Sequence, residues 1–163
     1  MGQDPQRAVR ADVGEHLDDQ QPFYDHTEAK KIESRGVEAV LSVFLLTSDD
    51  SERSTTTSLA TTAKAFARLW QVQRADGAWD WLDFGLEPYE TTGAVFHGAT
   101  LAAMASGSPT GRRVNANAAG VAGTEKLRGY LTMHLASQRL FNRTWALLAS
   151  SRLTGLLSTR DQD

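Results

Sequence analysis

The residues best suited to chemistry lie in one short segment in which carboxylates alternate with aromatic rings. The segment reads Trp79-Asp80-Trp81-Leu82-Asp83-Phe84, and Glu90 follows it. Two carboxyl groups flanking a glycosidic bond can act as general acid and general base, while aromatic faces can hold a cation or an apolar ligand. The same residues also suit a structural role, which we favour, because rings can fix a loop to helices while aspartates cap helix ends. The candidates are Asp80, Asp83 and Glu90 for catalysis, and Trp79, Trp81 and Phe84 for ligand binding.

Two polar side chains in other stretches are further candidates for ligand binding. His97 lies among small residues, where it could face a cavity or be a hydrogen-bonded core histidine. Glu38 comes three residues after Arg35, a spacing that favours an ion pair on one helix face. Alternatively, its carboxylate points into a barrel cavity.

Metal and cofactor sites are not predicted. The four histidines lack the spacing of a zinc-binding helix, and the chain has no cysteine. Because the sequence also has no Gly-rich phosphate loop, nucleophile elbow or haem-attachment sequence, no cofactor is expected.

A second pattern joins an amphipathic helix to a glutamine, a glycine and a tryptophan. Gln73, Gly77 and Trp79 follow the order Q-x3-G-x-W, and Phe66 lies upstream. Glycine permits the positive φ of a helix exit, and a glutamine amide can bond backbone groups that a helix end leaves unpaired. An indole ring adds a large apolar area and one N–H donor. We expect these side chains to seal the end of a helical hairpin.

The elements that must position these residues are helices. Apolar residues recur at helical spacing and no stretch alternates as a strand does, so we predict an all-α fold of about six helices in antiparallel hairpins. The helix at 33–46 is expected to be buried nearly all round, and residues 106–120 to form a long loop. The predicted helices cover 6–19, 33–46, 59–73 and 90–104, with two more around 127–134 and 141–148.

The length, amino-acid composition and net charge are those of an ordinary globular protein. Of its 163 residues, 40% are hydrophobic and 23% are charged, and a net charge of −3 gives no electrostatic reason to bind nucleic acid. No apolar run reaches about 18 residues, so no transmembrane segment is predicted. No signal peptide is visible. The expected location of the protein is therefore the cytoplasm, or a bacterial periplasm if the chain is part of a longer protein. We predict a polar helix and connector at 1–23, a helical domain at 24–157 and a polar tail at 158–163.

Residues 73–79 resemble the QW repeat of the terpenoid cyclase and protein prenyltransferase α/α-toroids. Three further phrases are similar to bacterial squalene–hopene-cyclase-like proteins, so the resemblance covers roughly residues 24–157. It implies helical hairpins in a partial α/α-toroid, with Phe66, Gln73, Gly77 and Trp79 as structural ties. The three phrases are Lys31-Ile32-Glu33-Ser34-Arg35-Gly36, Asp80-Trp81-Leu82-Asp83-Phe84 and Gly98-Ala99-Thr100-Leu101-Ala102.

The acid motif of this family is missing. A class II cyclase protonates an alkene with an Asp-x-Asp-Asp motif, whereas Asp18-Asp19 and Asp49-Asp50 lack the aspartate two residues upstream. The resemblance therefore implies a catalytically incomplete scaffold or isoprenoid-binding segment of a larger protein. Its partner would be an apolar isoprenoid, a missing neighbouring domain or a second copy of the chain. The alternatives are an α/α-barrel that acts on carbohydrate through the loop at 79–90, and a purely structural interaction module.

Overall fold

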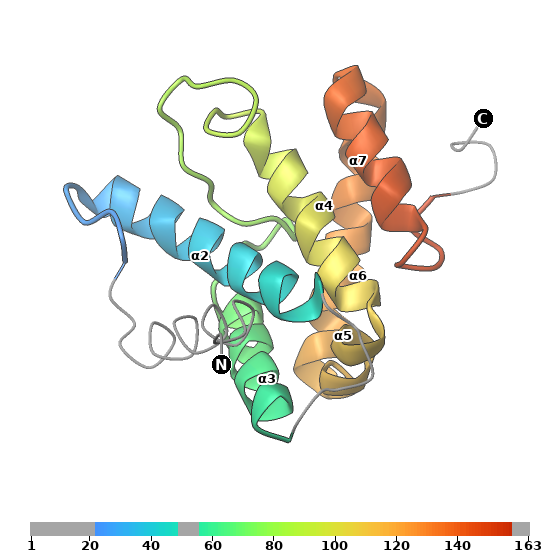
Figure 1. The fold of residues 1–163 in the computed structure, drawn as a ribbon. Helices are drawn as coiled ribbons and strands as arrows, with labels where there is room; N and C mark the ends of the chain where they lie inside the picture. Colours follow the sequence, from blue (N-terminus) through green and yellow to red (C-terminus); the bar gives the residue numbers. More distant parts are fainter. Residues whose placement is uncertain (1–21, 49–55, 158–163) are drawn as a thin grey trace, which may run out of the picture.

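The computed structural model describes residues 22–48 and 56–157, and these residues form a helical fold (Figure 1). No strand occurs in this described part, which contains an isolated bridge between Leu86 and Glu90. The all-α class and the number of helices are confirmed, whereas the curved toroid arrangement stays a prediction. The helices are α2 (Glu28–Ser48), α3 (Thr56–Gln71), α4 (Ala94–Gly107), α5 (Pro109–Val114), α6 (Ala118–His134) and α7 (Leu140–Ser150), with a short 3-10 helix η1 (Leu135–Ser137).

Helix α4 is the central element. It is rich in alanine and glycine, and every residue from 96 to 107 is buried. The flanking helices α2 and α7 pack most extensively on α4, and α5 and α6 contact it as well; Figure 1 shows α4 between α2 and α7. Small residues permit this close approach, since a Cβ on Gly107 would lie 2.5 Å from the backbone of Arg152.

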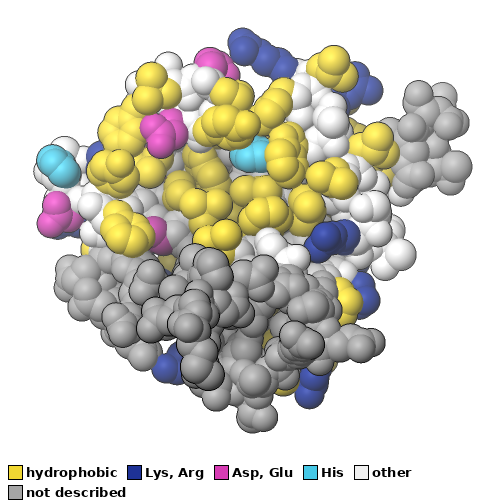
Figure 2. Space-filling view, in the orientation of Figure 1, with side chains coloured by type: hydrophobic (Ala, Val, Ile, Leu, Met, Phe, Trp, Pro, Cys, Tyr) yellow, Lys and Arg dark blue, Asp and Glu magenta, His cyan; other side chains and the backbone are white. Residues whose placement is uncertain are grey.

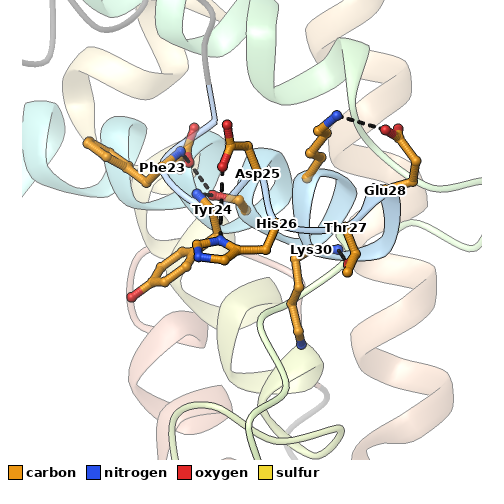
Figure 3. A network of polar contacts seen from close by, with 10 residues as sticks. Phe23, Tyr24, Asp25, His26, Thr27, Glu28 and Lys30 are labelled. Carbon is orange, nitrogen blue, oxygen red and sulfur yellow. Dashed lines mark hydrogen bonds and ion pairs between the residues drawn. The ribbon is translucent and has the colours of Figure 1, made fainter.

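The connector that precedes α2 makes hydrogen bonds with the first turns of this helix (Figure 3). Thr27 Oγ1 accepts a hydrogen bond from Lys30 N at 3.2 Å, as an N-cap residue does. Farther along the helix, the Glu38 carboxylate accepts from Phe23 N at 2.7 Å and from the Ser34 hydroxyl. Residues 22–27 are therefore folded back along the first turns of α2.

The predicted loop at 106–120 is wrong, because two polar residues within it act as helix N-caps. Ser108 Oγ accepts from Gly111 N at 2.8 Å and starts α5, with proline at the first helical position. Asn117 Oδ1 accepts from Gly120 N at 3.0 Å and starts α6. The composition resembles that of a loop, but the spacing is that of two successive helix starts.

Two further expectations about the helices are corrected. Helix α2 is not buried nearly all round, because Leu41 and Leu45 are 38% and 48% exposed. The helix predicted at 90–104 begins only at Ala94, so Glu90 lies in the preceding loop.

Several predicted features lie outside the described residues: the helix at 6–19, the tail at 158–163, and the acidic pairs Asp18-Asp19 and Asp49-Asp50. None of the described helices combines the length and the apolar character that crossing a bilayer requires.

Candidate functional site

The loop of residues 72–93, which joins α3 to α4, begins with a tie between helices. Gln73 Nε2 donates to Gly77 O and to Gly123 O, both at 3.0 Å, so one amide bonds its own loop and α6. Gly77 has a φ of +98°, as the sequence predicted for this position. A Cβ there would lie 2.2 Å from Lys126 O, so only glycine allows the loop to approach α6 this closely.

Trp79 lies across the C-terminal end of α3. Its side chain is 1% exposed, and its Nε1 donates to Leu69 O at 2.9 Å in the last turn of that helix. Its ring is 6.0 Å from that of Trp70, which is in turn 6.2 Å from the ring of Phe66. Gln73 and Gly77 thus fasten the loop to α6 and Trp79 fastens it to the end of α3, whereas their role in sealing a toroid hairpin stays a prediction.

Trp81 is also part of the packed structure. It is 8% exposed, and its Nε1 donates to Tyr89 O at 2.8 Å. Its six-membered ring lies on Gly98 of α4, where a Cβ would come within 2.2 Å of a ring carbon. On the other side of this segment, a Cβ on Gly36 of α2 would lie 2.0 Å from Asp80 O. Residues 80 and 81 are therefore in close contact with α2 and α4, respectively.

Two of the three candidate carboxylates, those of Asp80 and Asp83, have partners within the loop. Asp80 Oδ1 lies 3.5 Å from Arg74 Nη1, and Asp83 Oδ1 accepts from Gly85 N at 3.0 Å. The backbone of Glu90 pairs with that of Leu86 at 2.8 and 2.9 Å, which closes the tip of the loop. These contacts are those of a folded loop rather than of two carboxyl groups directed at one substrate bond.

Phe84 is the exposed ring of the predicted segment, with 44% of its surface accessible. Lys30 Nζ lies 4.4 Å from its centroid, a cation–π contact, and also donates to Asp83 O and Glu33 Oε2, both at 2.5 Å. The ring of Tyr24 is 5.5 Å from that of Phe84. A side chain of this protein thus already occupies the cation position on one face of Phe84.

Glu38, the candidate on α2, also makes hydrogen bonds that stabilise the fold. Its carboxylate holds Phe23 N and Ser34 rather than standing alone in a cavity, and Arg35 is exposed.

His97 lies in an aromatic cluster built from three elements. Its ring is 4.7 Å from Trp145 and 5.4 Å from Phe141, both on α7, and 5.6 Å from Tyr89 at the tip of the loop. Tyr89 and Phe141 are themselves 5.8 Å apart. The sequence indicated His97 as a candidate but not its neighbours, because residues of the loop, α4 and α7 meet only through tertiary packing.

The imidazole of His97 is neutral at physiological pH. It is 5% exposed, and burial lowers its pKa to about 4. Within the described part of the chain its Nδ1 has no hydrogen-bond partner. His97 is thus an aromatic core side chain with one unused polar atom.

The side chains of this cluster that reach the solvent form, with Leu148, an apolar surface, which we name the aromatic face. It consists of Tyr89 and the α7 stripe Phe141, Trp145 and Leu148, which recur at helical spacing, and His97 is buried beneath it. Tyr89 is 56% exposed and Leu148 is 47% exposed. Figure 2 shows hydrophobic side chains gathered in the region where Figure 1 draws α4 and its neighbours.

The comparisons with known proteins add no family to this geometry. Among the described residues, no group of three histidine, aspartate or glutamate side chains is arranged to hold a metal ion. Comparison with protein-family models, with curated proteins and with solved structures finds no match for the chain.

Proposed function

We propose that this chain is a helical scaffold domain that docks on an apolar protein surface through the aromatic face. The proposal rests on the contrast between the loop and that face: Trp79 is 1% exposed and hydrogen-bonded within the fold, whereas Tyr89 is 56% exposed. In the squalene–hopene-cyclase-like interpretation, the domain would be a hairpin segment of an α/α-toroid without its acid motif, and the aromatic face would meet the next hairpin.

The composition of the aromatic face favours a protein partner. Tyrosine and tryptophan are enriched at the energetic centres of protein interfaces because they bury a large area with few rotatable bonds. His97, which is buried beneath this face, is neutral, so no charge lies under a partner that covers the face. The ion pair of Glu87 with Arg139, at 3.5 Å, is exposed and lies next to Pro88–Tyr89 and Leu140–Phe141 in the sequence, as a polar rim would.

The carbohydrate alternative has less support. It requires two carboxyl groups that share an open cleft, and Asp80 faces Arg74 while Asp83 bonds the backbone of its own loop.

In solutions of the isolated chain, the available partner is a second copy, because an uncharged apolar face is complementary to itself. Sedimentation velocity from micromolar to near-millimolar concentration tests this. We expect reversible association of the wild type, and loss of association in Leu148→Lys, which places a charge within the aromatic face.

A matched control is Leu147→Lys. Leu147 is 48% exposed on the same helix, close to the 47% of Leu148, but its side chain lies off the stripe of Phe141 and Trp145. A wild type that remains monomeric throughout, or equal effects of the two substitutions, would refute the docking role of the aromatic face.

A further inference from the structure

The C-terminal helices carry an excess of basic side chains. Residues 109–157, which form α5, α6, η1, α7 and the turn after α7, contain seven of the 17 arginine and lysine residues but one of the 20 acidic residues, Glu125. Among the side chains coloured by type in Figure 2, Lys and Arg but no Asp or Glu lie beside the C-terminal end of α7. The net charge of −3 therefore conceals a basic part of the surface.

Three arginines from three elements meet near the C-terminal end of α4. Arg112 of α5 donates to the carbonyl oxygen of Gly107, the last residue of α4. The backbone of Arg152 lies against the same glycine, where a Cβ would be 2.5 Å from the Arg152 carbonyl group. Two residues farther along this turn, Thr154 O accepts from Arg128 of α6. The arginine cluster, as we name it, consists of Arg112, Arg113, Arg128 and Arg152.

Most of the positive charge of the arginine cluster is not balanced by a carboxylate. Glu125 lies 3.5 Å from Arg128 Nε, and no other carboxylate of the described residues comes within 4.0 Å of the cluster. The bonds of Arg112 and Arg128 to carbonyl oxygens serve the fold, because cationic side chains stabilise the carbonyl end of a helix. The exposed side chains of Arg113 and Arg152 make no such bond within the described chain, so they are available to a partner.

We infer that the arginine cluster binds an acidic segment of a partner protein, in which aspartate or glutamate residues follow one another closely. A guanidinium group can donate two parallel hydrogen bonds to one carboxylate, which makes arginine well suited to this contact. Opposite charges on the two surfaces speed association and exclude basic partners. This role goes beyond docking through the aromatic face, to which none of the four arginines belongs.

Two observations favour an acidic protein segment over a nucleic acid. None of the exposed large hydrophobic side chains of the described residues lies at 105–118 or 151–157, so unpaired bases have no ring near the cluster on which to stack. A long polyanion would also meet the rest of the chain, which contains 19 of the 20 acidic residues. A short acidic segment can contact the cluster alone and avoids this repulsion.

The test uses fluorescein-labelled octaglutamate as the acidic probe and a short labelled DNA duplex as the second probe. Each is titrated with the full chain and followed by fluorescence anisotropy. We expect octaglutamate to bind more tightly than the duplex. Its affinity should fall as sodium chloride is raised from about 10 to about 150 mM, because the Debye length shortens from about 30 to about 8 Å.

Variants that remove one charge each locate the binding. Arg113→Ala and Arg152→Ala change exposed side chains of the cluster, and each should weaken octaglutamate binding by about two- to fivefold, as the loss of one exposed ion pair gives. Arg35→Ala is the matched control, because Arg35 is an exposed arginine of α2 outside the cluster, and it should leave the affinity nearly unchanged. Absence of binding at low salt, an equal loss in Arg35→Ala, or tighter binding of the duplex would each overturn the inference.

Discussion

The two halves of the loop between α3 and α4 use aromatic residues in opposite ways. In the first half, Trp79 and Trp81 are 1% and 8% exposed, and each indole donates to a backbone carbonyl. In the second half, Phe84 and Tyr89 are 44% and 56% exposed. One loop therefore contains both a structural anchor and a surface available to a partner.

The difference follows from what each half packs against. Gly98 lies under the ring of Trp81, and Gly36 lies against the backbone of Asp80, so the first half reaches the helix backbones directly. Gly85, in the second half, has no atom within 4 Å of the position its Cβ would take. The burial of Trp81 therefore depends on Gly98 of α4, which leaves room for the ring.

The largest expected effect is on the free energy of unfolding when one aromatic side chain in each half of the loop is replaced by alanine. Trp79→Ala removes a fully buried ring and its hydrogen bond to Leu69, and should lower the free energy of unfolding by about 3–5 kcal/mol. Phe84→Ala removes a half-exposed ring, and should lower it by about 1 kcal/mol or less. Urea denaturation followed by circular dichroism measures both. Comparable losses in the two variants would contradict the division of the loop.

Tyr89, in the second half of the loop, contacts His97, and the burial of His97 should make the free energy of unfolding depend on pH. Burial holds the pKa of His97 at about 4, whereas an unfolded histidine has a pKa of about 6.5, so the unfolded state binds more protons between these values. The contribution of His97 is complete above about pH 6.5 and is lost as the pH falls toward 4, by up to about 3 kcal/mol. The check is chemical denaturation across this range in the wild type and in His97→Phe, which keeps a ring in the cluster. The difference between the two curves isolates His97 from other groups, and parallel curves would show that His97 titrates normally.

The sequence predicts local geometry here better than it predicts the site. The positive φ of Gly77 and the helix-end positions of Gln73 and Trp79 follow from short-range stereochemistry, and they are observed.

What the sequence could not predict depends on contacts between distant residues. Tyr89, His97 and Trp145 come from three elements, and no periodic pattern links them. The bond between Trp70 and Asn115 joins residues 45 positions apart, and Asn115 lies in the stretch 106–120 that composition alone assigned to a loop. Helix starts set by Ser108 and Asn117 were missed because capping residues and loop residues are the same amino acids.

A smaller effect compares two glycines that both have positive φ. Gly77→Ala places a Cβ 2.2 Å from Lys126 O, so it combines backbone strain with a clash and should be destabilising by at least about 2 kcal/mol. Gly85→Ala, at a φ of +69° in open space, has the backbone strain alone and should be destabilising by about 1 kcal/mol. Thermal unfolding of both variants gives the difference. An equal effect at the two positions would mean that the loop is free to move away from α6.

The smallest expected effect tests the amide that fastens the first half of the loop to α6. Gln73→Leu keeps the size of the side chain but removes two hydrogen bonds, to Gly77 O and Gly123 O, and should lower the free energy of unfolding by about 1–2 kcal/mol. Gln71→Leu is the matched control, because Gln71 is exposed and its bond to Arg68 is long, at 3.4 Å, so its loss should change stability by less than about 0.5 kcal/mol. Hydrogen exchange sharpens the measurement, since loss of the tie should raise exchange at Gly77 N and Ala78 N before it does so in α4. If exchange instead rises uniformly through the helices, Gln73 stabilises the whole core, and the loop is not the separately fastened unit that its contacts describe.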